Sequence, residues 1–138
     1  MGRILAIDYG KKRTGLAVTD PLKLIAGGLT TVETAKLVEY LQAYMQKEPV
    51  ERIIVGLPKQ MNGQESDNMK NITPFVNRLR NLYPQLPIEY YDERFTSVLA
   101  HRAMLESGIG KKARQNKALV DEISATIILQ SYMESVKF

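Results

Sequence analysis

Short apolar runs alternate with amphipathic stretches along this chain, and the alternation predicts an α/β fold. The run over residues 3–8 is almost continuously apolar and ends in an acid, which is typical of a central strand buried on both faces. A turn at 10–13 and a second strand at 14–19 would complete a hairpin with it. Further strands are expected at 30–33, 52–57 and 87–92.

Apolar residues at helical spacing fill the segments between these strands. The pattern predicts helices over 34–47, over about 72–82, over 96–107, and after residue 117 up to about 136. Pro74 lies inside the second of them, so that helix either begins or bends there. The order β-β-β-α-β-α-β-α-α predicts a mixed five-stranded sheet flanked by helices, in a single domain over residues 1–138.

Three acidic positions fall where such a fold can bring them together. Asp8 ends the first strand, and Asp92 and Glu93 end the last. If these strands are parallel, their carboxyl ends share one edge of the sheet, where sites form in open α/β folds. Asp121 extends the inward-facing stripe of the final helix, which continues with Ala125, Ile128 and Tyr132.

Each acid taken alone also has an ordinary structural explanation. Asp121 could be a helix-start residue that the helix dipole stabilises, and Asp8 a turn former at the end of a strand. Glu93 could form a surface ion pair with the adjacent Arg94. Helical geometry directs Glu122, the neighbour of Asp121, away from the core. The three acids at one sheet edge are harder to explain in these structural terms.

Three carboxylates in one pocket favour hard divalent cations. The chain has no cysteine, so a thiolate metal site and a cysteine nucleophile are both excluded. Oxygen ligands select Mg²⁺ or Mn²⁺, and two such ions roughly 3.5–4 Å apart can activate water and stabilise the leaving oxygen in phosphodiester hydrolysis. We therefore expect a metal-dependent nuclease in which Asp8, Glu93 and Asp121 bind metal and carry catalysis, with Asp8 as the bridging ligand.

Basic residues lie beside these acids along the chain. The net charge of +4 favours a polyanionic partner such as nucleic acid. Candidate phosphate contacts, which position a nucleic acid without reading its sequence, are Lys11, Lys12, Arg13, Arg94, Lys111, Lys112, Arg114 and Lys117. Gly10 and Gly15 would let the backbone turn tightly beside Asp8. A solvated charged loop is the plain alternative for either basic cluster.

The apolar runs are too short for a membrane span or a secretion signal. A cytoplasmic protein with no membrane partner is therefore expected.

Four ordered motifs resemble one known family. They are DYGKKRTGLAVTD at 8–20, GLP at 56–58 with NG at 62–63, DERFTS at 92–97, and KALVD at 117–121 followed by SA at 124–125 and IILQ at 127–130. Together they resemble the YqgF family of pre-16S ribosomal RNA nucleases, also called Holliday-junction-resolvase-like proteins. The resemblance spans essentially the whole chain.

This resemblance implies a ribonuclease-H-like fold with an acidic triad at Asp8, Glu93 and Asp121. It also implies divalent-metal-dependent nuclease activity in maturing the 5′ end of 16S ribosomal RNA. Precursor ribosomal RNA would then be the main partner, with structured DNA and the ribosome as further candidates. Ala118 stands where the family often has glycine and Ser124 where it often has alanine, so these departures leave the acids untouched.

Three other functions stay open at this point. A non-catalytic nucleic-acid-binding module would tolerate loss of Asp8 but not of the charges at 111–117. A sugar-kinase or actin-like ATPase shares the Asp-x-Gly pattern, but it needs two lobes and 138 residues supply one. A four-way DNA junction resolvase would normally work as a symmetric dimer. A monomer is expected here, with a dimer as the alternative.

Overall fold

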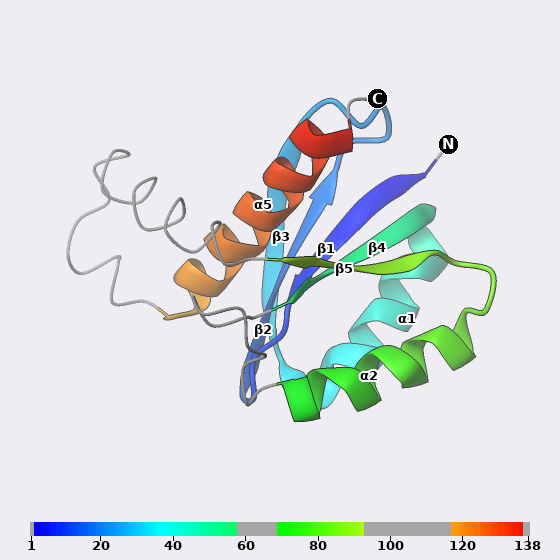
Figure 1. Cartoon of the computed structure of the whole chain (residues 1–138), viewed down its shortest axis with the longest axis vertical. Helices are drawn as coiled ribbons and strands as arrows, with labels where there is room; N and C mark the ends of the chain where they lie inside the picture. Colours follow the sequence, from blue (N-terminus) through cyan, green and yellow to red (C-terminus); the bar gives the residue numbers. More distant parts are fainter. Residues whose placement is uncertain (1, 58–68, 93–116, 137–138) are drawn as a thin grey trace.

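A five-stranded mixed sheet forms the centre of the fold (Figure 1). The computed structural model describes residues 2–57, 69–92 and 117–136. Its strands are β1 (Arg3–Asp8), β2 (Arg13–Thr19), β3 (Ala26–Glu33), β4 (Val50–Leu57) and β5 (Ile88–Asp92). They lie in the order β3-β2-β1-β4-β5. β1 is antiparallel to β2 and parallel to β4, and β4 is parallel to β5. The predicted mixed sheet is therefore confirmed.

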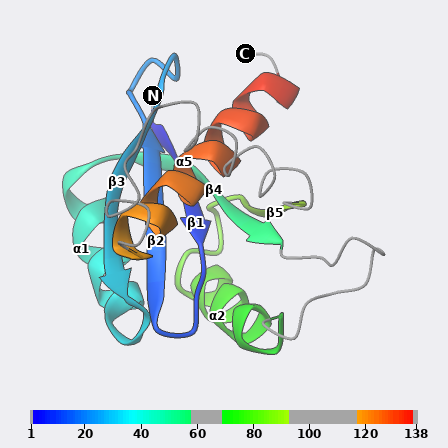
Figure 2. The ribbon, with the colours of Figure 1, turned by 90° about the vertical axis from the view of Figure 1, so that its left-hand side faces the viewer.

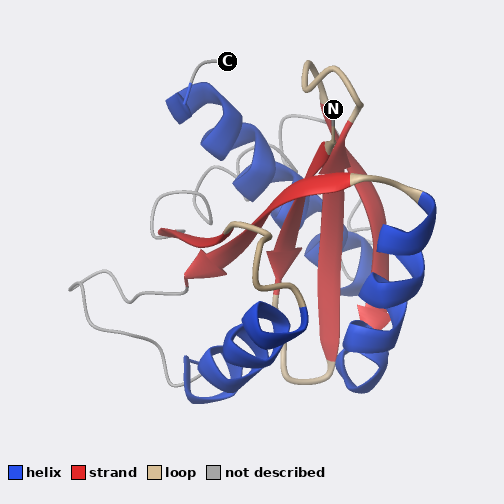
Figure 3. Ribbon diagram, turned by 90° about the vertical axis from the view of Figure 1, so that its right-hand side faces the viewer, coloured by secondary structure: helices blue, strands red, loops and turns tan. Residues whose placement is uncertain are grey.

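Helices cover both faces of this sheet, as Figures 2 and 3 show from two sides. One face carries α5 (Lys117–Val136), and the other carries the 3-10 turn η1 (Thr34–Lys36) with α1 (Leu37–Lys47) and α2 (Met69–Leu82). Strand alternation divides the core accordingly. Ile4 and Ala6 of β1 belong to the cluster formed with α5, and Leu5 and Ile7 to the cluster formed with α1 and α2. None of the helices in the described ranges is long and apolar enough to cross a membrane.

Element boundaries differ from the prediction where local propensity misleads. β3 begins at Ala26, four residues before the expected start, because Gly27 and Gly28 pair with β2 despite their low strand propensity. The first helix opens as the 3-10 turn η1, so its α-helical part starts at Leu37. α2 starts at Met69, so Pro74 lies inside the helix and does not begin it. The helix expected over 96–107 lies outside the described residues.

A buried threonine joins the start of β1 to the end of β2. The Thr19 side chain is fully buried, and its Oγ1 accepts a hydrogen bond from the Ile4 N–H at 3.0 Å. In Thr19→Val that N–H loses its partner inside the core, so we expect the free energy of unfolding to fall by about 1–3 kcal/mol. Urea denaturation measures the change. Thr30→Val on the partly exposed β3 is the control, and equal midpoints for the two variants would contradict the prediction.

Candidate active site

Asp8 lies at the edge where the parallel strands end together. It is the last residue of β1, and the preceding Ile7 pairs with Val55 of β4. Two residues further along β4, Leu57 pairs with Asp92 of β5. The carboxyl ends of three neighbouring strands therefore share one edge, which is the position predicted for a site.

The alternation of β1 directs Asp8 to the face of the sheet that α5 covers. Ile4 and Ala6 precede it at two-residue intervals and pack with α5. Asp8 is also the direct cross-strand partner of Gly15 in β2. Directly opposed residues of an antiparallel pair project to the same face. The partly buried Asp8 carboxylate therefore lies on the side of the sheet where α5 begins.

α5 approaches the sheet closely at Gly15. A Cβ atom at this position would overlap the backbone carbonyl of Asp121 and would lie 3.0 Å from the backbone nitrogen of Glu122. Only a residue without a side chain allows this approach. We expected Gly15 to serve a tight turn, but it lies inside β2 and serves a helix contact. As a result, the turn of α5 that contains Asp121 and Glu122 lies against Gly15, the residue that pairs with Asp8.

Asp121 is held by an ion pair with Arg13. The Arg13 Nε donates to the Asp121 Oδ2 at 3.2 Å, and the two side chains are 38% and 26% exposed. Arg13 lies two residues before Gly15 on β2 and thus on the same face. The sequence suggested a phosphate contact for this arginine. Its observed partner is one of the predicted catalytic acids.

The turn between β1 and β2 is anchored by Thr34, the residue that follows β3. The Thr34 hydroxyl donates to the Gly10 carbonyl at 2.6 Å and lies 2.9 Å from the hydroxyl of the buried Thr14. The Thr34 N–H also donates to the Lys12 carbonyl at 2.9 Å. These bonds fix the backbone on both sides of the turn, while the side chains of Lys11 and Lys12 are exposed at its tip.

Tyr9 points to the opposite face from Asp8. Its ring lies 5.0 Å from that of Phe75 in α2, measured between ring centroids. Burial raises the pKa of the Tyr9 phenol above its usual value, so this group stays neutral at physiological pH. We therefore assign Tyr9 to packing and not to proton transfer.

The structure places only part of the predicted site. Glu93, Arg94, Lys111, Lys112 and Arg114 lie outside the described residues, and so does the side chain of Lys117 at the start of α5. Within the described ranges no three acidic or histidine side chains are grouped closely enough to hold a metal ion. Two of the three predicted acids, Asp8 and Asp121, do come from elements in contact. Their carboxylate oxygens are the donors that Mg²⁺ and Mn²⁺ take, so the donor chemistry fits a hard cation.

The expectation for Glu122 was wrong. Its side chain does not turn away from the fold but lies over β3, where a Cβ at Gly28 would come within 2.8 Å of its Cγ. The reason is that α5 packs across β2 and β3 as well as β1, so a wider arc of the turn that contains Glu122 faces the sheet. Because Glu122 lies over β3, Asp121 is the acid of this turn whose backbone rests on Gly15, the cross-strand partner of Asp8.

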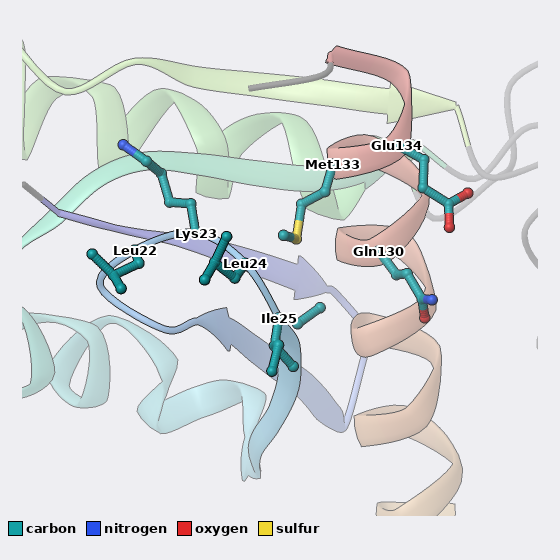
Figure 4. Close-up of a pocket in the computed structure, with 8 residues that line it drawn as sticks. Leu22, Lys23, Leu24, Ile25, Gln130, Met133 and Glu134 are labelled. Carbon is teal, nitrogen blue, oxygen red and sulfur yellow. The ribbon is translucent and has the colours of Figure 1, made fainter.

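A separate apolar hollow lies at the opposite end of the sheet from the β1–β2 turn (Figures 2 and 4). It measures about 710 Å³ and lies between the β2–β3 loop and the C-terminal half of α5. Its lining includes Leu22, Leu24, Ile25 and Met133, and Glu134 is the one carboxylate that the described residues place there. Because a single carboxylate cannot supply the ligands of a hard-cation site, we do not assign this hollow to the predicted chemistry.

Comparison with known proteins identifies the family. Residues 2–135 match the family model RuvX, described as Holliday junction resolvase. The chain belongs to the RuvX family. Relatives from Phocaeicola vulgatus and Bacteroides thetaiotaomicron are 71% and 69% identical over 138 residues, covering 100% of this chain and 99% and 100% of their own. Each carries the name "Putative pre-16S rRNA nuclease".

Solved structures confirm the ribonuclease-H-like fold of this RuvX-family chain. The Thermus thermophilus RuvC bound to a Holliday junction substrate aligns with a TM-score of 0.58 at 14% identity, covering 99% of this chain and 97% of that one. A second Thermus thermophilus RuvC structure gives 0.52 at 15% identity, covering 96% of both chains. At such low identity the likeness concerns the fold alone.

Proposed function

We propose that this RuvX-family protein is a metal-dependent nuclease that hydrolyses a phosphodiester bond during 5′-end processing of pre-16S ribosomal RNA. The observation that carries the proposal is the meeting of Asp8 and Asp121 across Gly15. Asp8 pairs with Gly15, and the backbone of Asp121 rests on it. The names of the full-length relatives supply the substrate class. We further propose that the protein acts in the cytoplasm as a monomer.

Glu93 is our candidate for the third acid, in preference to Asp92. In β5, Tyr91 packs with the α5-side cluster, whereas Ile88 and Tyr90 belong to the opposite cluster. The same alternation assigns Asp92 to the side of α1 and α2. The next acidic residue along the chain is therefore the better candidate for the face on which Asp8 and Asp121 lie.

In the proposed mechanism Asp8, Glu93 and Asp121 would hold the metal. Mg²⁺ or Mn²⁺ ions, most simply a pair, would supply an activated water and neutralise charge on the leaving oxygen. Asp8 would contribute its carboxylate from the end of β1, the central strand of the sheet. Lys11 and Lys12, exposed on the anchored turn beside Asp8, would hold the phosphate backbone of the substrate.

The remaining basic residues extend this proposed path for the substrate. Arg13 lies on the α5 face beside the acids. Phosphate contacts are also proposed, from the sequence, for Arg94, Lys111, Lys112, Arg114 and Lys117. These contacts would orient the strand across the sheet edge and leave the choice of cleavage position to the shape of the RNA.

The direct test is cleavage of two substrates. The protein is incubated with a ribosomal RNA precursor and, separately, with a four-way DNA junction, each with Mn²⁺, with Mg²⁺ or with EDTA. We expect metal-dependent cleavage of the RNA near the mature 5′ end. If only the four-way junction were cleaved, the proposed activity would change to that of a Holliday junction resolvase, as in the family's description. No metal-dependent cleavage of either substrate would overturn it.

Metal binding is expected to stabilise the folded protein. A ligand that binds only the folded state at a hundred times its Kd adds about 2.7 kcal/mol to the free energy of unfolding. For a domain of this size we expect Tm to rise by several degrees as Mn²⁺ is titrated. Asp8→Asn should lose this rise. Asp20→Asn, in the exposed β2–β3 loop, should keep it. The same rise in both variants would place the metal elsewhere.

A further inference from the structure

The ion pair between Arg13 and Asp121 has the geometry of a weak, separable contact. Between these two side chains the Arg13 Nε donates one hydrogen bond of 3.2 Å, without the second parallel bond of a bidentate pair. Both side chains are partly exposed, at 38% and 26%. Pairs of this exposure shift an equilibrium by only about two- to fivefold.

One member of this pair, Asp121, is also a proposed metal ligand. Asp121 is the acid of α5 that lies against Gly15, opposite Asp8. A guanidinium bonded to its carboxylate withdraws electron density from the oxygens that a cation would need. The positive charge of Arg13 also repels a divalent ion at the same oxygens, an effect that increases as water is excluded. Arginine and metal therefore act against each other at Asp121.

We propose that Arg13 and the metal compete for Asp121. In the metal-free protein the guanidinium neutralises this carboxylate, and metal binding releases it toward the phosphate of the substrate. This inference rests on the proposed function, because it takes Asp121 as a metal ligand. It adds a coupling, in which the arginine becomes available for nucleic acid only after the metal is in place.

The surroundings of Arg13 allow such a movement of the side chain alone. Its backbone is fixed by pairing with Glu33 of β3, and the preceding turn is tied down by Thr34. The guanidinium is on a long side chain next to the exposed Lys11 and Lys12. After release it would thus join these two lysines and leave the sheet unchanged.

The test is the affinity of the protein for Mn²⁺ alone, measured by isothermal titration calorimetry. Arg13→Gln removes the competing charge, so we expect its Mn²⁺ affinity to be about three- to tenfold tighter than that of the wild type. Arg3→Gln is the matched control. Arg3, at the start of β1 and away from the site, makes a similar single bond through Nε to Glu48 at 3.3 Å, and its Nη1 also donates to the Thr19 carbonyl at 2.8 Å. Its Mn²⁺ affinity should equal that of the wild type.

A second measurement needs no substitution and so does not depend on the folding of a variant. The Nε–Hε resonance of Arg13 is followed by NMR while Mg²⁺ is added to the wild-type protein. We expect it to shift toward the position of a solvent-exposed arginine, with a midpoint that matches the Mg²⁺ affinity. A resonance that stays in place at saturating Mg²⁺ would overturn the competition.

The outcomes separate this inference from the proposed function. If the wild type binds Mn²⁺ and Asp8→Asn does not, the metal site stands. Unchanged or weaker Mn²⁺ binding by Arg13→Gln would then overturn the competition alone and make Arg13 a residue that orients Asp121. If the wild type binds no Mn²⁺, both the metal site and the competition are wrong.

Discussion

Replacing Asp8 with asparagine is expected to lower the rate of metal-dependent cleavage about a thousandfold while leaving the fold intact. Asparagine keeps the size of the side chain but removes the negative charge that binds the metal, and loss of metal assistance costs several kcal/mol of transition-state stabilisation. The measurement is the single-turnover rate on a labelled ribosomal RNA precursor at saturating Mn²⁺.

Asp20→Asn is the matched control for this experiment. Asp20 is an aspartate of the β2–β3 loop whose Oδ1 accepts hydrogen bonds from the Leu24 and Ile25 N–H groups. An asparagine oxygen can accept the same bonds, and the loop lies at the other end of the sheet (Figure 2). Its cleavage rate should match that of the wild type. Cleavage by Asp8→Asn within tenfold of the wild-type rate would exclude Asp8 as a metal ligand.

Gly15→Ala is expected to impair both stability and metal binding. The added methyl would meet the backbone carbonyl of Asp121, which cannot rotate away as the end of a flexible side chain could. Overpacking of this kind typically lowers the free energy of unfolding by about 1–3 kcal/mol. The methyl would also push the start of α5 away from Asp8. We therefore expect urea denaturation to show the loss of stability and calorimetry to show Mn²⁺ affinity reduced at least about tenfold.

Gly27→Ala tests whether the effect is specific to the helix contact. Gly27 lies in the neighbouring strand β3, and a Cβ there would meet nothing within 4 Å. Its free energy of unfolding should change by no more than about 0.5 kcal/mol. If Gly15→Ala and Gly27→Ala behaved alike, the close approach of α5 at Gly15 would not be what positions Asp121.

The sequence predicted the sheet edge well because that edge depends on local pattern. The apolar run that ends in Asp8 identified β1, and the parallel neighbours followed from the crossover rule. The helical period of Ala125, Ile128 and Tyr132 placed Asp121 on the inner face of α5, and all three are buried in the structure. Period and chain order were sufficient for these predictions.

Features that depend on which helix packs across which strand could not be predicted from hydrophobic period and chain order. Gly15 is a glycine because α5 rests on it, and Glu122 faces β3 because the helix spans more than one strand. Arg13 and Asp121 are 108 positions apart, and nothing local in either segment indicates their pairing. Each of these contacts is set by tertiary packing, which overrides the turn propensity of glycine and the solvent preference of glutamate and arginine.

A crystal of the protein soaked in Mn²⁺ tests the central claim most directly. Anomalous scattering locates manganese without any assumption about its ligands. We predict a peak at bonding distance, about 2.1 Å, from carboxylate oxygens of both Asp8 and Asp121, with the Arg13 guanidinium moved off Asp121. Manganese bound only at other carboxylates, or no peak at a saturating concentration, would contradict the account.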